Sequence, residues 1–284
     1  MHLLRLLALL IPAQMMFGGV GSSDTFYWSG RIPAGQIIEV KGVNGGIHAE
    51  STPGGVVEII AQKAGVASDP SEVGVEVVEH DGGVTVCAVY PTGAESACQP
   101  GQSSLLFSGS DVQVEFIVRV PSGVRFVGRT VNGLVEAASL EADAEAHTVN
   151  GNIRLRTTGA AQAETVNGSI NAALGKVAAP ATLSTVNGGI TLEMAPETHA
   201  DVHARTVTGG ITGNFPLVVH GRLANKHAHT KIGGGGPEVR IVTVNGSINL
   251  HHSACRGCSE HCRDHEIGRH PAHGAGVSQE PRGS

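Results

Sequence analysis

The chain has 284 residues, of which 40 are glycine and only 3% are aromatic, and its formal net charge is -6. So few large side chains argue against a conventional α/β enzyme core, while 40% apolar and 15% charged residues argue against disorder throughout. An acidic chain with no run of Lys and Arg also lacks the basic patch that is typical of nucleic-acid-binding proteins.

The N-terminal segment has the pattern of a secretory signal peptide. Arg5 precedes an apolar stretch at 6–11 that is too short to cross a bilayer, and the small residues Gly19 and Gly21 fit a cleavage site. We expect residues 1–21 to be removed and the mature protein to be exported, to the periplasm, the cell surface or the medium. An uncleaved anchor is the alternative.

Residues 24–125 read as an N-terminal β cap. Five longer strands are expected there, at 37–40, 56–62, 73–79, 84–89 and 112–120, before the turn at 121–123. Cys87 and Cys98 flank a turn-rich loop, and export permits a disulfide between them. In the chain-entropy model such a loop closure stabilises the fold by about 3 kcal/mol.

A short motif, T-V-N-G-x-I, recurs through residues 126–250 and has a partial copy near residue 44. The positions that follow Thr-Val, or Val alone in the first copy, are Asn44, Asn132, Asn150, Asn167, Asn187, Thr208 and Asn245. From Asn132 onward the steps are 18, 17, 20, 21 and 37 residues. The last step is close to two units, which indicates a degenerate repeat or an insertion.

Each repeat reads as a strand, an Asn-Gly turn, a second strand and a second turn. We favour an all-β fold, a β-solenoid of the parallel β-helix type with rungs of about 18 residues. Equal spacing would then stack Asn on Asn every ~4.8 Å as an amide ladder. The alternative is an antiparallel hairpin array that uses Asn-Gly as a type I′ turn.

Alternation along the strands predicts which side chains face the interior. Ala142, Ala144, Ala146 and Thr148 share one face, and the charged residues between them share the other. Thr is therefore expected inside, with its hydroxyl bonded to nearby backbone, and the next residue outside. This predicts an exposed valine ladder, a candidate binding surface: Val131, Val149, Val166, Val186, Val207 and Val244. A bulge at Thr-Val that buries the valines is the alternative.

Two histidine-rich segments interrupt or follow the repeats. Residues 215–237, with His220, His227 and His229, are expected to leave the stack as a long hairpin or loop. Residues 251–284 form a flexible Cys/His-rich tail, in which Cys255, Cys258, Cys262, His261 and His265 have the ligand types for zinc or copper. The alternative is an end whose thiols oxidise after export. No other cofactor is expected.

The T-V-N-G-x-I rungs, the entry segment at 118–124 and the glycine-rich stretch before the last repeat resemble a bacterial family of exported repeat proteins. That family is a domain of unknown function whose members are provisionally described as adhesins. The resemblance covers about residues 24 to 250. It implies a β-solenoid-like fold and a cell-envelope or surface role, and it supplies no catalytic residues.

No enzyme motif emerges from the repeats, where the carboxylates do not recur at a fixed rung position. The sequence therefore predicts a non-catalytic scaffold that binds a surface or envelope component, protein or glycan, or a second copy of itself, through many weak contacts. One alternative is an envelope sensor that binds a partner protein or metal through its tail. Another is a carbohydrate-active enzyme on a β-helix.

Overall fold

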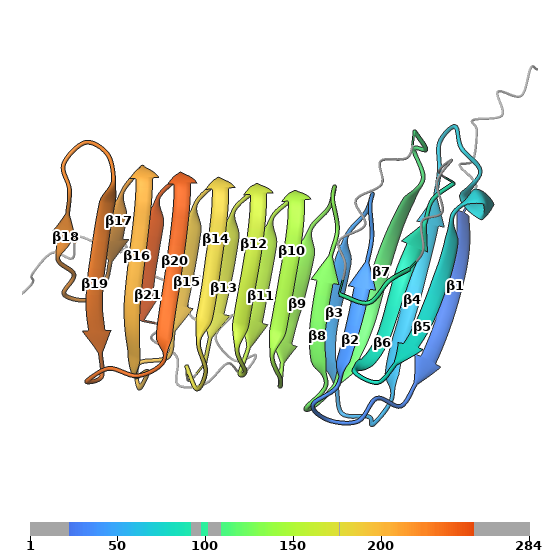
Figure 1. Cartoon of the computed structure of the whole chain (residues 1–284), viewed down its shortest axis with the longest axis horizontal. Helices are drawn as coiled ribbons and strands as arrows, with labels where there is room; N and C mark the ends of the chain where they lie inside the picture. Colours follow the sequence, from blue (N-terminus) through green and yellow to red (C-terminus); the bar gives the residue numbers. More distant parts are fainter. Residues whose placement is uncertain (1–22, 92–97, 102–108, 176, 253–284) are drawn as a thin grey trace, which may run out of the picture.

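The computed structural model describes residues 23–91, 98–101, 109–175 and 177–252. Strands in two sheets make up almost all of it, and the only helical segment in these ranges is a 3-10 turn, η1, at Pro70–Glu72 (Figure 1). Within the same ranges no helix is long and apolar enough to span a membrane. The all-β prediction is confirmed.

The two sheets lie face to face, and each runs the length of the molecule (Figure 1). Sheet A has ten strands, in spatial order β1 (Ser23–Gly30), β4 (Val57–Ala64), β7 (Gln113–Pro121), β3 (Ile47–Thr52), β9 (Val135–Leu140), β11 (Ile153–Thr157), β13 (Ile170–Leu174), β15 (Ile190–Met194), β21 (Ile248–His252) and β17 (Ile211–Gly213). Sheet B has eleven, in order β18 (Val219–His220), β19 (Lys226–Ile232), β16 (Ala200–Thr208), β20 (Glu238–Asn245), β14 (Ala181–Asn187), β12 (Ala161–Asn167), β10 (Ala144–Asn150), β8 (Arg125–Arg129), β2 (Ile37–Lys41), β6 (Gly83–Val89) and β5 (Gly74–His80).

Each repeat forms one rung, in which a strand of sheet B turns at Asn-Gly and continues as a strand of sheet A. Successive rungs pair in parallel, so that Ala144 lies opposite Ala161 in sheet B and Ile153 opposite Ile170 in sheet A. The two strands that flank an Asn-Gly corner belong to different sheets. This arrangement confirms the β-solenoid and excludes the hairpin array.

The N-terminal region first adds two more rungs to the stack and then closes its end. β2 and β3 form a rung directly against β8 and β9, and β6 and β7 form a further rung beyond them. In that outer rung, β6 ends at Val89 and β7 begins at Gln113, and the sequence between them contains no Asn-Gly. Within the N-terminal region, β1, β4 and β5 are the strands that make antiparallel pairs alone, and they close this end of the stack. The closing cap is therefore smaller than residues 24–125.

The C-terminal end departs from sequence order. β20, orange-red in Figure 1, lies between β14 and β16, and β21 likewise lies between β15 and β17. The segment before β20 forms β18 and β19, an antiparallel pair that extends sheet B beyond β16. Residues 215–237 thus contain the expected hairpin, but the expectation that they leave the stack was wrong, because β19 pairs along most of β16. The chain then returns and places the Asn245 rung between those of Asn187 and Thr208.

The interior combines a sheet of small side chains with a sheet of larger ones. Sheet B contributes mainly alanines, such as Ala146 and Ala163, and sheet A contributes Ile and Leu, such as Ile153 and Leu192, all of them buried. Alternation holds in the strand after the corner, where Leu155 is buried and Arg154 is exposed. Because the inward side chains of sheet B are so short, the two sheets lie close together and few aromatic residues are needed to fill the core.

Candidate binding surface

The threonine of each motif serves the stacking of rungs. Its side chain is buried, and its hydroxyl donates to the carbonyl of the motif glycine in the neighbouring rung. Thr165 donates to Gly151 at 2.9 Å, and Thr185 donates to Gly168 at 2.9 Å. Each hydroxyl thereby satisfies a carbonyl at the corner, which confirms the predicted inward orientation and backbone bond of Thr.

The motif glycine allows the corners to approach one another. A Cβ built on Gly168 would lie 1.8 Å from the carbonyl oxygen of Gly151, and one on Gly188 would lie 2.0 Å from that of Gly168. No side chain fits at these distances. Glycine is required here by the close stacking of backbone on backbone.

The motif asparagines form a continuous ladder along one edge of the stack. Each side-chain amide donates to the next side-chain oxygen at 2.8–2.9 Å, in the order Asn245, Asn187, Asn167, Asn150, Asn132 and Asn44. At the N-terminal end of the ladder, the amide of Asn44 donates to the carbonyl of Ser110. At the other end, Thr208 takes the Asn position in the rung beyond that of Asn245. The predicted amide ladder is therefore present, and it links rungs that are not consecutive in sequence.

Two of the four motif positions, Val and Asn, reach solvent, and because the Asn amides bond to one another in the ladder, only the valine is exposed without a polar partner. Val166, Val186 and Val244 are 40%, 40% and 37% exposed, and they occupy three adjacent rungs of sheet B. Val149 and Val207, on the flanking rungs, are half-buried. We call these five side chains the valine row.

Val131 does not belong to this row, because it is only 1% exposed. The expectation of an outward, accessible Val131 was wrong. Strand β8 ends at Arg129, and Val131 joins the hydrophobic core together with Val43 of the neighbouring rung, whose carbonyl accepts from the Val131 amide at 3.3 Å. In that neighbouring rung, residues 98–101 cover the outer side chains Glu39 and Lys41 of β2 and bond to both. The outer face of sheet B is therefore open only in the middle and at the C-terminal end.

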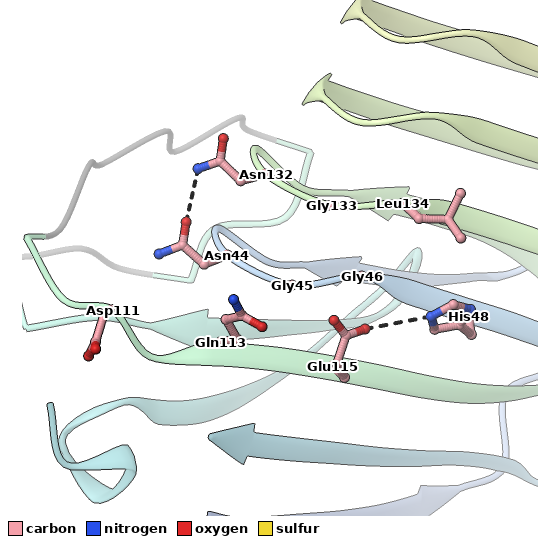
Figure 2. Close-up of a pocket in the computed structure, with 10 residues that line it drawn as sticks. All are labelled: Asn44, Gly45, Gly46, His48, Asp111, Gln113, Glu115, Asn132, Gly133 and Leu134. Carbon is pink, nitrogen blue, oxygen red and sulfur yellow. Dashed lines mark hydrogen bonds and ion pairs between the residues drawn. The ribbon is translucent and has the colours of Figure 1, made fainter. Parts of the chain in front are cut away.

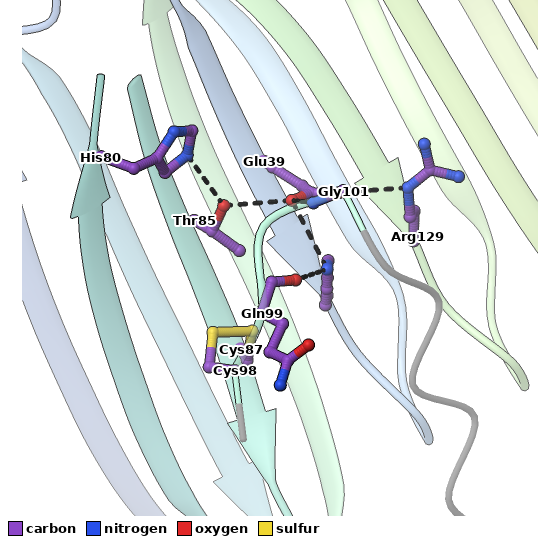
Figure 3. Close-up of a disulfide and its surroundings, with 9 residues drawn as sticks. Glu39, His80, Thr85, Cys87, Cys98, Gln99, Gly101 and Arg129 are labelled. Atoms are coloured by element: carbon purple, nitrogen blue, oxygen red, sulfur yellow. Dashed lines mark hydrogen bonds and ion pairs between the residues drawn. A yellow bond between two sulfur atoms is a disulfide. The ribbon is translucent and has the colours of Figure 1, made fainter. Parts of the chain in front are cut away.

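The predicted disulfide between Cys87 and Cys98 is formed and holds this covering segment against sheet B (Figure 3). Beneath it lies a buried group of charges that the sequence did not reveal. Glu39 accepts from the amide of Gly101 at 3.0 Å and from Arg129 at 3.2 Å, and lies 3.5 Å from Lys41.

Burial would raise the pKa of Glu39, but the Gly101 amide, Lys41, Thr85 and Arg129 outweigh it and the pKa is lowered. Burial lowers the pKa of Lys41, and Glu39 partly offsets this. The charges balance one another within the fold, as expected for a structural cluster.

A polar pocket of about 390 Å³ lies beside the N-terminal end of the amide ladder (Figure 2). His48 stands between Glu115, at 3.5 Å, and Glu136, at 3.3 Å. Asp111 lines the pocket but bonds the amides of Ala67 and Ser68, which lower its pKa to about 2. These groups are already paired, so the pocket presents few free polar atoms.

Several predicted sites lie outside the described residues. These are the signal peptide at 1–21 and the tail ligands Cys255, Cys258, Cys262, His261 and His265. Within residues 23–91, 98–101, 109–175 and 177–252, no cluster of three or more His, Cys, Asp or Glu is arranged to hold a metal ion.

Comparison with known proteins identifies the repeat region. Residues 129–251 match the family model described as Toastrack DUF4097, which confirms the resemblance predicted from the motifs. No curated protein matches the chain.

Two solved structures are similar over most of their length. One is provisionally described as a cell adhesion protein from Clostridium sporogenes, with 12% identity, a TM-score of 0.42 and coverage of 82% of this chain and 100% of its own. The other is provisionally described as an adhesin from Bacteroides fragilis, with 10% identity, a TM-score of 0.28 and coverage of 81% and 97%. Similarity at this level does not establish a shared function.

Proposed function

We propose that this chain, whose repeat region matches the Toastrack domain, is an exported, non-catalytic scaffold that binds an envelope or surface component through the outer face of sheet B. The observation that carries the proposal is the valine row. Large aliphatic side chains are usually buried, yet three of them face solvent in adjacent rungs.

The spacing of the valine row suits a repetitive or extended ligand. Adjacent strands lie ~4.8 Å apart, so the row offers one weak apolar contact per rung in a straight line. The Thr, Asn and Gly of the motif are occupied in holding rungs together, which leaves Val as the motif residue that is free to bind. Many weak contacts of this kind would add through avidity.

The test replaces Val166, Val186 and Val244 together with Ser in the mature chain. Binding to bacterial envelopes prepared from the expression host is followed by co-sedimentation, and self-association by light scattering. We expect the triple variant to lose most envelope binding or self-association, while its thermal midpoint changes little because these side chains are already partly exposed.

A matched control lies on the opposite face of the same rungs. Asn171, Thr191 and Asn249 form an equivalent row on sheet A, and their replacement with Ser should leave binding unchanged. Equal binding by the valine variant and the wild type would refute a role for the row. A chain that lacks residues 253–284 separates this role from one carried by the tail.

Export is tested in the same host. We expect the full chain to be recovered outside the cytoplasm with a mass that corresponds to loss of the first 21 residues. Retention of the intact chain in the cytoplasm would contradict this part of the proposal.

A further inference from the structure

A basic groove lies at the C-terminal end of the outer face of sheet B. It has a volume of about 800 Å³ and is lined by β16, β19, β20 and the turn before β19. Its apolar side chains include Val207, Val242 and Val244, so it continues the valine row. Its remaining lining is dominated by histidine and arginine.

Strand register brings these residues together in two rows across the sheet. In the first row, Arg240 on β20 lies opposite His203 on β16, which lies opposite His229 on β19. The second row contains Val242, Arg205, His227 and His220. Four imidazoles and two guanidiniums thus share one exposed face, although they come from segments up to 37 residues apart (from His203 to Arg240).

The imidazoles contact one another and leave their nitrogens free. The rings of His203 and His229 stack at 4.2 Å and 11°, and those of His220 and His227 at 5.3 Å and 23°. Within the described part of the chain, none of these four rings takes part in a hydrogen bond or an ion pair, and neither does the guanidinium of Arg205.

The charges around the imidazoles are mainly positive. Besides Arg205 and Arg240, the packed strands carry Lys226, which donates to the carbonyl of Gly209 at 2.7 Å, and Lys231. The acidic groups on these strands are Asp201 and Glu238, which lie opposite each other one row away. Glu238 accepts from Arg240 at 2.8 Å. A protein of net charge -6 therefore has a locally cationic groove here.

We infer that this groove binds a linear polysaccharide that carries carboxylates, and that it binds more tightly at mildly acid pH. The inference deepens the proposed function, on which it rests, by giving the chemical class of the ligand. A guanidinium such as that of Arg205 donates two parallel N–H hydrogen bonds to the two oxygens of a carboxylate. The valines and flat imidazole faces suit the C–H faces of sugar rings.

The acid dependence follows from the imidazoles. Imidazole gains its charge between about pH 8 and pH 5, and two stacked cationic rings repel each other. An anion placed over the pair relieves that repulsion, so binding should take up protons. Carboxylic acids have ordinary pKa values near 4 and remain charged at pH 5.5, so the attraction increases as the pH falls.

A carboxylated glycan fits this face better than a nucleic acid does. Nucleic-acid sites usually carry a patch or stripe of Lys and Arg, whereas the lining of this groove supplies only Arg205 and Arg240, and Arg240 is paired with Glu238. The groove offers one guanidinium without a partner in the described structure, which matches one carboxylate at a time.

The experiment measures the binding of alginate to the full mature chain by calorimetry at pH 7.5 and 5.5, at low salt and with EDTA present. We expect about tenfold tighter binding at pH 5.5, with proton uptake that is seen as a heat difference between two buffers. Dextran, which is neutral, should not bind at either pH.

Two variants separate the contributions of the groove. His203→Gln with His229→Gln should abolish most of the pH gain and keep the weaker binding seen at pH 7.5. Arg205→Gln should weaken binding at both pH values by about three- to tenfold. Arg154→Gln, on the outer face of sheet A, removes an exposed arginine elsewhere and should change nothing. Circular dichroism confirms that each variant is folded.

The inference is overturned if alginate does not bind at pH 5.5, or if the double histidine variant keeps the full pH gain. It is also overturned if a DNA oligonucleotide binds more tightly than alginate, or if binding appears only when Zn²⁺ replaces EDTA. The Val166→Ser, Val186→Ser double variant, whose positions lie outside the lining of the groove, distinguishes this site from the proposed function. Loss of envelope binding in that variant without alginate binding in the wild type would retain the scaffold and reject the acidic ligand.

Discussion

The motif glycine offers the sharpest test of how the rungs stack, because two neighbouring glycines of one corner differ in their surroundings. At Gly188, an added Cβ would lie 2.0 Å from the carbonyl oxygen of Gly168. At Gly189, the nearest atom would be the carbonyl oxygen of Ser247, at 3.2 Å. Gly188→Ala and Gly189→Ala are therefore matched variants, and only the first should disrupt the stack.

The structure allows the effect to be estimated. An ordinary contact begins near 3.4 Å, so the corner at Gly188 must move by about 1.4 Å from its present 2.0 Å. This lengthens three bonds between the two corners: the Gly168 amide to the Asn187 carbonyl at 3.0 Å, Thr185 to the Gly168 carbonyl at 2.9 Å, and Asn187 to Asn167 at 2.9 Å. At about 1 kcal/mol each, their loss destabilises the fold by about 3 kcal/mol.

Gly189→Ala should change the free energy of unfolding by less than about 1 kcal/mol. Other repeats carry a side chain at the same position, namely Asn152, Ser169 and Ser247. Alanine also restricts the unfolded chain, which offsets part of any small repulsion in the folded state.

Urea and thermal unfolding, followed by far-ultraviolet circular dichroism, measure the difference. About 3 kcal/mol corresponds to a decrease of about 6–12 °C in Tm for a domain of this size. If the two variants are equally stable, the close approach of corners is not what requires glycine. If both lose about 3 kcal/mol, the 3.2 Å approach at Gly189 is as unfavourable as the 2.0 Å approach at Gly188, and the estimate from distance is wrong.

Three further predictions concern the ladder, the half-buried His147 and the disulfide. Asn167→Asp replaces the amide that donates to Asn150 with a carboxylate, so the fold should be less stable at pH 7. Its stability should recover near pH 4, where a protonated Asp can donate again. A loss of stability that does not vary with pH would contradict this prediction. Burial, together with the charge of Arg129, lowers the pKa of His147, so folding favours the neutral ring. The free energy of unfolding of the wild type should therefore fall as the pH drops below about 6.5. In urea titrations, His147→Gln should lose less of this free energy between about pH 7.5 and pH 5.5. Reduction of the disulfide should cost about 3 kcal/mol in the same assay, whereas the Cys87→Ser, Cys98→Ser double variant should be insensitive to reductant.

The strands and corners of the stack could be predicted from the sequence because each depends on residues within a single repeat. Strand alternation fixes which side chains face the interior, so Thr inside and Val outside could be read from a single repeat. Regular spacing of Asn predicted the ladder, since only a translational stack places equivalent residues side by side. The strands at 37–40 and 112–120 were found in the same way, as β2 and β7.

The order of the rungs could not be predicted, because pairing between distant strands is set by the whole sheet. Nothing in the sequence around Asn245 indicates that its rung lies between those of Asn187 and Thr208. The burial of Val131, Glu39 and Lys41 was missed for a related reason. Alternation marks all three as outward, but β8 ends at Arg129 and Val131 joins the core, while the segment held by the disulfide covers Glu39 and Lys41.

The basic groove could have been suspected from two short segments. Residues 202–205 and 227–229 both alternate small or apolar residues with histidine or a cation, which indicates outward cationic rows. Their convergence depends on an antiparallel register that places His203 opposite His229. The sequence supplies the residue types, and the hairpin supplies their juxtaposition.

The motif residues stack the rungs, and the residues between them vary, which suggests that the variable residues determine binding specificity. Thr, Asn and Gly recur because stacking requires the same contacts at every corner, so they cannot distinguish one part of the surface from another. The outward positions between them are under no such constraint and do differ: in the middle of sheet B they carry Glu145 and Glu164, and toward its C-terminal end they carry His203 and Arg205. Binding should therefore be general along the valine row and selective where the outward residues change from acidic to basic.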